Sequence, residues 1–382
     1  MIPLILLALT CTVASAQYIG TGSVSQGVAT TTIPTVFSCP GGRPTALGQI
    51  TASDGSSWIV PADVRFLEEA YPFASVLYDQ CSKATYRTTS EALSHLDGSD
   101  VIVIDADGEL ITGFIFADNY FELWVNGQFV GKDNVPFTPF NSNIVRFRVR
   151  RPFTIAMLLV DWEEHLGLGT ENNAGVSFHP GDGGMVALFR NESEDVVAVT
   201  NASWRAQTFY SSPIKDLSCP SEIGTVRSTA DCNTDGTDNG SQYYAIYWPI
   251  PDGWTLQEFD DSAWPAASTY ANTQIGVNNK PAYMNFTDVF DDPNYDAQFI
   301  WSTNVVLDNC VIVRYTVDKL TSIRDVNSAG KSPCTYVYDM MGTLIWHGAT
   351  SNLDTTSLIP GLYLIVQFDA SGNAVVSKIN TV

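Results

Sequence analysis

The sequence predicts a mainly β protein whose body is a jelly roll or β-sandwich. Short apolar runs separated by Gly, Pro, Asn and Asp recur from Trp58 onward, which is typical of closely spaced strands and turns. The 28 glycines and 19 prolines supply turn residues along the chain. Hydrophobic residues make up 45% of the 382 residues, which suffices for a packed core and excludes a disordered acidic protein.

The first sixteen residues predict a secretory signal peptide. Residues 2–14 form an apolar run, and Ala14-Ser15-Ala16 has the small residues of a cleavage site. The run is shorter than the ~20 residues that a membrane-spanning helix needs. We therefore expect a secreted or cell-surface protein with no transmembrane span in its mature chain.

Composition divides the rest of the chain into four segments. We expect an N-terminal linker or edge segment at 17–57, a β-rich region at 58–217, a second β-rich segment at 218–316 and a small C-terminal β-domain at 317–382. The two β-rich segments can be two modules or parts of one sandwich.

Individual elements follow from local patterns. Two β-prone runs joined by Asn126-Gly127 predict a hairpin, because both residues tolerate the positive φ of a type I′ turn. The apolar run 154–160 predicts a buried strand. The early helix candidate is 64–78, which Pro72 would split or kink.

The cysteines indicate disulfides, as expected of an exported protein. Six of the seven lie beyond the predicted signal, and they allow 15 pairings. The members of this set are Cys39, Cys81, Cys219, Cys232, Cys310 and Cys334. Proximity in the sequence favours Cys39 with Cys81 and Cys219 with Cys232.

The charge excludes two classes of partner. The chain has 19 Lys and Arg against 41 Asp and Glu, a net charge of −22. Nucleic acid binding needs a basic surface, and so does attachment to anionic lipid. We therefore expect no nucleic acid partner.

The tail predicts strands and turns that would close a small antiparallel sandwich. It contains the sequence YDMMG at 338–342 and LIPGLYLIV at 358–366. This combination resembles the C-terminal sorting domain of the bacterial type IX secretion system, in which a YDxxG element precedes an LxxGxYxxV strand. The resemblance implies a small Ig-like β-sandwich, contact with secretion machinery and export to the cell surface. The alternative is an ordinary terminal β-domain.

Two fragments in the middle carry a second resemblance. The sequence FDDSAW at 259–264 is followed by FIW at 299–301 and by Arg314, and WVNGQFVG lies at 124–131. These fragments resemble the FDDSxW…IW…R and VNGxxVG elements of galactose-binding-like modules, here in reversed order. The resemblance implies a jelly roll that binds carbohydrate or another extracellular polymer.

Sugar sites are concave and combine aromatic rings with a few convergent polar groups. A loop ahead of the predicted hairpin and scattered aromatic and histidine residues match this chemistry. The predicted ligand-binding residues are Asp118, Asn119, Tyr120, Trp124, Trp162 and His179. Any single tryptophan can equally be a core anchor.

One loop matches the start of a calcium site. Asp231, Asn233 and Asp235 place oxygens at alternate positions before Gly236, and Asn239 falls at the ninth position. Gln242 replaces the usual bidentate Glu at the twelfth. Ca²⁺ is thus the one cofactor that the sequence indicates, the alternative being a solvated loop beside a disulfide.

A catalytic interpretation rests on the run DWEEH at 161–165. A glycosidase needs two carboxylates across a cleft, one of them with a raised pKa. Glu163, Glu164 and His165 are the candidates, together with Asp161; alternatively these are loop residues.

The leading hypothesis is therefore a secreted or cell-surface, non-enzymatic protein that binds carbohydrate or an extracellular polymer through a jelly-roll-like domain. One alternative is a secreted hydrolase that acts on glycans. The other is a structural or adhesive surface protein.

Overall fold

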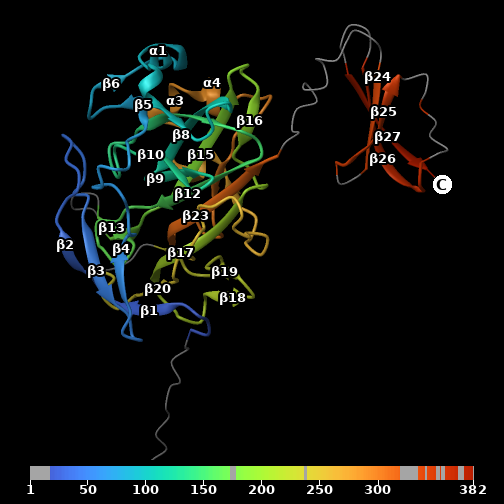
Figure 1. Ribbon diagram of the computed structural model, residues 1–382. Coiled ribbons are helices and arrows are strands. Elements are labelled where there is room, and N and C mark those ends of the chain that lie inside the picture. The colour runs from blue at the N-terminus through green and yellow to red at the C-terminus, as the bar shows by residue number, and fades with distance from the viewer. Residues whose placement is uncertain are drawn as a thin grey trace, which may run out of the picture. The chain divides into compact units, whose positions relative to one another are not determined.

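The computed structural model describes residues 18–172, 178–235, 239–318, 334–339, 342–349, 353, 358–368 and 374–381. The chain divides into two compact units, one ending at Asp318 and the other starting at residue 319. Both units are built mainly from antiparallel strands, so the predicted fold class is confirmed (Figure 1). The predicted signal peptide lies outside the described residues.

The body contains a seven-stranded antiparallel sheet. Its strands come from all three predicted body segments, which therefore share one unit. In spatial order they are β1 (Ser23–Gln26), β20 (Tyr244–Tyr247), β17 (Arg205–Ile214), β23 (Asp308–Val317), β12 (Phe153–Val160), β9 (Tyr120–Val125) and β10 (Gln128–Lys132).

A nine-stranded sheet faces it. The main path is β21 (Ser268–Tyr270), β22 (Phe299–Trp301), β15 (Gly184–Asn191), β8 (Glu109–Asp118), β11 (Ser142–Val149), β5 (Ser75–Asp79) and β6 (Ala84–Thr85). Two further strands lie off this path: β16 (Val196–Val199) pairs with β15, and β7 (Val101–Val103) runs parallel to β11.

Smaller elements complete the body. A three-stranded sheet consists of β2 (Thr30–Ile33), β3 (Leu47–Thr51) and β4 (Ser57–Val60). Two short hairpins are β13 (Thr170–Glu171) with β14 (His179–Pro180), and β18 (Ser221–Ile223) with β19 (Val226–Ser228). The helices are α1 (Thr89–Ser94), a 3₁₀ turn at Gly98–Asp100, α2 (Asn272–Ile275), α3 (Pro281–Met284) and α4 (Thr287–Phe290).

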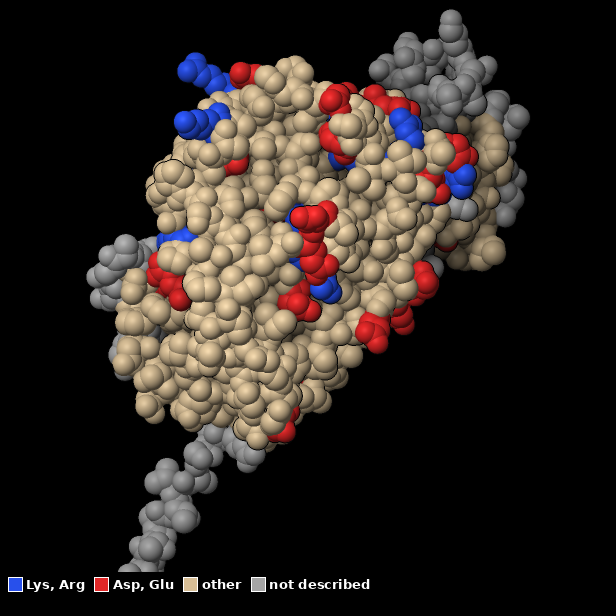
Figure 2. Space-filling model, turned by 60° about the vertical axis from the view of Figure 1, so that its left-hand side comes forward, with Lys and Arg blue, Asp and Glu red and all other residues tan. Residues whose placement is uncertain are grey.

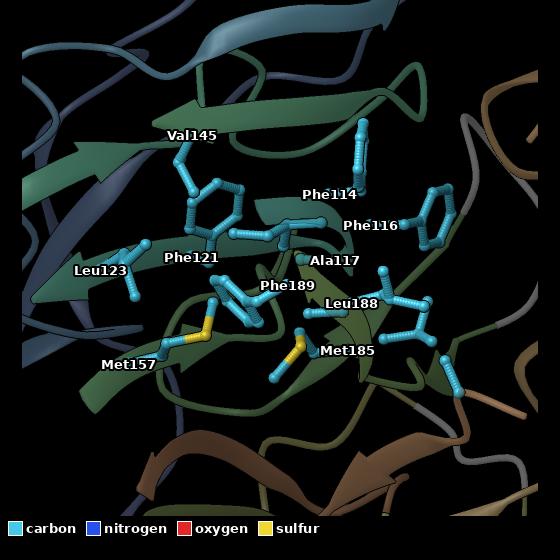
Figure 3. Packing of buried hydrophobic residues seen from close by; sticks show 14 of the residues in the cluster. Phe114, Phe116, Ala117, Phe121, Leu123, Val145, Met157, Met185, Leu188 and Phe189 are labelled. Atoms are coloured by element: carbon cyan, nitrogen blue, oxygen red, sulfur yellow. The ribbon is translucent and has the colours of Figure 1, made fainter. Parts of the chain in front are cut away.

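The main core lies between the two large sheets. Figure 3 shows residues of β8, β11 and β15 close to Phe121, Leu123 and Met157 of the opposite sheet. Phe147 of β11 meets Phe153 of β12 edge to face, with ring centroids 5.9 Å apart. All eight residues of β12 are buried, which confirms the buried strand predicted at 154–160.

Both outer faces of the sandwich are covered as well. Tyr283 of α3 packs edge to face on Phe116 of the nine-stranded sheet, at 5.7 Å between centroids. On the other side, Trp58 of β4 stacks on Tyr247 of the seven-stranded sheet at 5.5 Å. Because these layers bury both faces, the central strands are apolar on both sides rather than alternating.

The predicted hairpin between β9 and β10 is confirmed. Gln128 pairs with Val125, leaving a two-residue turn in which Asn126 has φ 49° and Gly127 has φ 80°. These left-handed values are the reason that an Asn-Gly pair occurs here.

The helix predicted at 64–78 is wrong. The segment before β5 contains only isolated turns, in which the backbones of Glu68 and Tyr71 donate to the carbonyls of Arg65 and Glu68 at 3.0 and 3.1 Å. A distant side chain also bonds to the carbonyls of this segment. The Lys132 ammonium donates to the carbonyls of Arg65 and Phe66 at 2.9 Å and of Glu68 at 2.8 Å. Tertiary contact has overridden local helical propensity.

Both favoured disulfides are present. Cys39 is bonded to Cys81, and Cys219 is bonded to Cys232. Cys310, which was also expected to be paired, is a free thiol buried in β23. In the described part of the chain every helix is too short or too polar to cross a membrane.

The side chain of Arg314 holds the FDDSAW segment and the residues just before it in place. Its side chain is almost fully buried and donates to Asp261 at 2.7 Å and to the Leu256 carbonyl at 3.1 Å. The guanidinium also lies 5.0 Å from the centre of the Phe259 ring. Phe259 and Asp261 of the FDDSAW segment therefore contact Arg314, which follows them by more than fifty positions in the sequence.

The C-terminal unit, taken by itself, contains one four-stranded antiparallel sheet. The order is β25 (Leu344–Ala349), β24 (Cys334–Asp339), β26 (Gly361–Phe368) and β27 (Ala374–Thr381). Val337, Tyr363 and Ile365 are buried on one face of it. The predicted tail strands are therefore present.

Candidate functional site

The sandwich forms a cleft where β8 and β12 end and β15 begins. Asp118, the last residue of β8, pairs with Gly184, the first residue of β15. The next residue, Asn119, donates from its backbone to the Val160 carbonyl at 3.2 Å, and its side-chain oxygen accepts from the Trp162 backbone at 2.6 Å. These bonds hold the end of one sheet against the end of the other.

Two adjoining cavities of about 740 and 250 Å³ make up this cleft. Their linings share Arg43, Thr138, Phe140 and Lys280. Glu164 and His165 line the larger cavity. The titratable residues that line the smaller one, apart from the shared cations, are Asp118, Asp161, Glu171, His179 and Asp182; we call the whole site the acidic cleft.

Most carboxyl groups that line the smaller cavity of the acidic cleft are buried. Asp118 and Asp161 are each 4% exposed and Glu171 is 8% exposed, whereas Asp182 is half-buried. Burial, followed by repulsion from neighbouring carboxylates, raises the pKa of Asp118 and Asp161 well above the usual value. The same two causes raise the pKa of Asp182 to about 6. The site therefore favours the neutral form of these carboxyl groups more than water does.

Two cations partly offset this negative charge. Arg43 forms an ion pair with Glu171 and lies 3.7 Å from Glu164. Lys280 lies 4.8 Å from the centre of the Phe140 ring, and its charge lowers the pKa of both Asp118 and Asp182. By contrast, the charges that act most strongly on Asp161 are all negative.

The loop that carries Arg43 is positioned from several directions. The Cys39–Cys81 disulfide ties it to the end of β5. The Arg43 backbone donates to Thr138 Oγ1 at 3.2 Å. A Cβ on Gly42 would lie 2.4 Å from the Thr138 carbonyl oxygen, so only glycine permits this approach.

The structure brings together three of the predicted ligand-binding residues, Asp118, Asn119 and His179. It removes two others from any ligand, because Tyr120 and Trp162 are fully buried. Tyr120 donates to Glu122 at 2.9 Å, and the Trp162 indole donates to the Ala46 carbonyl at 3.0 Å. Both are core residues, and their prediction as ligand contacts is corrected.

Trp124 is placed outside the acidic cleft as well. It is half-buried on β9, and its ring meets Trp254 edge to face at 4.8 Å and Phe129 at 5.0 Å. It packs between neighbouring aromatic rings and does not line either cavity.

The catalytic candidates separate into two environments. Glu164 and His165 line the larger cavity; His165 Nδ1 lies 3.0 Å from Thr170 Oγ1, and burial lowers its pKa. Glu163 lies in the core, where the Tyr210 hydroxyl donates to its carboxylate at 2.9 Å. Glu163 therefore cannot contact a ligand in the acidic cleft.

Sequence reasoning did not assign site roles to Arg43, Glu171, Asp182 or Lys280. One signal could have found part of the cluster: an acidic residue at or close to the end of a buried strand. Asp118 ends β8, Asp161 directly follows β12, and Asp182 lies two positions before the first residue of β15.

The predicted calcium loop is only partly described, since residues 236–238 fall outside the described ranges. The Lys215 ammonium donates to Asn233 Oδ1 at 3.1 Å and to the Asp235 carbonyl at 2.8 Å. Asn239 Oδ1 accepts from the Ser241 backbone at 3.2 Å. Among the described residues, no group of three or more His, Cys, Asp and Glu is placed to hold a metal ion. The Ca²⁺ site, which also included Asp231, stays a prediction.

Comparison of the chain with protein-family models, with curated proteins and with solved structures finds no match.

Proposed function

We propose that the protein is a secreted or cell-surface carbohydrate-binding protein and that its ligand occupies the acidic cleft. The observation that carries this proposal is the convergence of Asp118, Asp161 and Asp182 in one concave site. Hydroxyl groups of a sugar donate to carboxyl oxygens and accept from protonated carboxyl groups, so the cluster offers several hydrogen-bonding groups to one ligand.

The remaining lining suits the same ligand. Arg43 and Lys280 present donors to ring and hydroxyl oxygens, and half-buried Phe140 offers an apolar surface to C–H groups. The larger cavity, of about 740 Å³, is in the range of small-molecule sites, and the smaller one of about 250 Å³ adjoins it, so a segment of a few sugar units would fit.

Export is part of the proposal. The signal pattern at 1–16 and the two disulfides suit an oxidising, extracellular environment. The tail strands carry the YDxxG and LxxGxYxxV pattern, so secretion machinery is the proposed partner of the C-terminal unit.

The test is a glycan array probed with the mature chain, followed by affinity electrophoresis in the polysaccharides that score. We expect Asp118→Asn to weaken binding at least about tenfold, because the amide places an NH₂ group, which only donates, where the carboxyl group has a second acceptor oxygen. Asp260→Asn, in an exposed loop outside the cleft, should bind like the unaltered protein. If no glycan binds and the protein polymerises instead, the adhesive alternative is favoured.

A further inference from the structure

We infer that the acidic cleft hydrolyses the glycosidic bonds of its ligand, with Asp161 as general acid and Asp182 as general base. This inference rests on the proposed function, because it assigns chemistry to the same site. Both residues line the smaller cavity, and they come from different parts of the sandwich: Asp161 follows β12, and Asp182 precedes β15.

Asp161 is placed to keep its proton. It is 4% exposed, and Gly181 covers it so closely that a Cβ there would lie 3.1 Å from Asp161 Oδ2. Its strongest electrostatic neighbours are Glu171, Asp118 and Asp182, all of them acidic. Ionising Asp161 would add a negative charge to this set in a water-poor site, and its pKa is accordingly raised well above the usual value.

Asp182 is placed to lose its proton. Its side chain is half-buried and therefore accessible to water, and both Lys280 and His179 favour its charged form. Its pKa of about 6 leaves it mostly ionised at pH 7. Two carboxyl groups whose surroundings push their pKa values apart are the usual arrangement for acid and base in one site.

Asp118 fits a different role. One of its oxygens, Oδ1, accepts from the Asn119 side chain at 2.7 Å, which restricts the carboxylate. Asp118 is suited to hold a substrate hydroxyl rather than to transfer a proton. A purely structural role explains the cluster poorly, because burying several carboxyl groups together lowers the stability of the fold. Titratable groups with strongly shifted pKa values are instead typical of functional sites.

The step balances with water as the only co-reactant. Asp161 gives its proton to the glycosidic oxygen as the bond from the anomeric carbon to that oxygen breaks. Asp182 takes a proton from a water molecule, whose oxygen forms the new bond to the anomeric carbon. The products are two shorter saccharides, one with a new reducing end. Exchange of protons with solvent then restores Asp161 and Asp182.

The experiment uses the mature chain with β-1,3-glucan, xylan, polygalacturonate and chitin oligosaccharides. Binding is followed by affinity electrophoresis and cleavage by new reducing ends. We expect the bound polysaccharide to be cleaved, and Asp161→Asn to lower the rate at least about 100-fold, with the variant still binding the polysaccharide. Asp260→Asn should cleave at the unaltered rate.

The pH–rate profile adds a readout that needs no variant. The rate of the unaltered protein should fall on the acidic side with a midpoint near the Asp182 pKa of about 6, and Asp182→Asn should abolish that limb along with most activity.

The outcomes separate the two proposals. Binding without new reducing ends overturns the hydrolytic inference and leaves the proposed function standing, whereas neither binding nor cleavage overturns both. Unaltered cleavage by Asp161→Asn, or a rate that does not fall below pH 6, overturns the assignment of acid and base.

Discussion

Lys132 shows how a single buried charge organises a long irregular segment. The residue is 1% exposed, and its ammonium donates to three backbone carbonyls and lies 4.5 Å from the Phe73 ring centre. Replacing it with methionine keeps a similar volume but removes the three bonds from the ammonium, so that the carbonyls of Arg65 and Glu68 keep only their backbone donors.

We expect Lys132→Met to lower the free energy of unfolding by about 3 kcal/mol, the usual cost of removing one partner from a buried charged contact. Urea unfolding measures this change. Lys83→Met, at an exposed position, should change it by less than about 0.5 kcal/mol. A loss below 1 kcal/mol for Lys132→Met would show that the backbone turns hold the segment without the ammonium.

At the scale of single residues, the sequence predicted those features that depend only on a residue and its immediate neighbours in the chain. The Asn126-Gly127 turn follows from the φ values that these two residues tolerate. Burial, however, is not a local property. Tyr120 and Trp162 have the right side chains for a sugar site, and only the three-dimensional packing shows that both are enclosed.

Among the elements, the two disulfides close chain segments of very different length. Cys39 and Cys81 are 42 residues apart, and Cys219 and Cys232 are 13 apart. In the chain-entropy model the longer loop gains about 4 kcal/mol and the shorter one about 3 kcal/mol.

Replacing both cysteines of the first pair by serine should therefore destabilise the protein more than the same change in the second pair. It should also weaken glycan binding, because the Cys39–Cys81 bond holds the loop that carries Arg43. Calorimetric melting and affinity electrophoresis of the two double variants test both points. Equal binding by the two would show that the Arg43 loop is held by its other contacts.

The prediction of whole strands and helices from the sequence also failed where long-range contacts decide the structure. Apolar runs located the strand that became β12, because a buried strand is recognisable by itself. The segment 64–78 has helical propensity, yet its carbonyls bond to Lys132, which lies more than sixty positions away. The acidic cleft depends on strand pairing in the same way. It joins Arg43, Asp118, Asp161, Asp182 and Lys280, which no sequence spacing connects.

At the scale of the whole molecule, the acidic residues behind the net charge of −22 do not all lie on the surface. Figure 2 shows one face on which most of the surface is uncharged and acidic groups outnumber basic ones. Several carboxyl groups are buried instead. Burial raises the pKa of Glu122 to about 7 and that of Asp133 and Glu163 to about 8.

These buried carboxyl groups decide how the stability of the fold changes with pH. A carboxyl group whose pKa is raised by folding binds more protons in the native state than in the unfolded chain between its two pKa values. Stability therefore falls as pH rises through that window, here from about 4.5 to 8. Exposed groups with lowered pKa, such as Asp54 at about 2, act only in more acidic solution.

The protein should accordingly melt at a higher temperature at pH 5 than at pH 8. A loss of about 3 kcal/mol over this window corresponds to roughly 6 °C for a protein of this size. Calorimetric scans in buffers of matched ionic strength measure it. Glu163→Gln removes one titrating group but keeps an acceptor for Tyr210, so its melting temperature should depend less on pH, whereas Asp260→Asn should follow the unaltered protein. A melting temperature that rises from pH 5 to pH 8 would mean that these buried carboxyl groups are charged in the folded state.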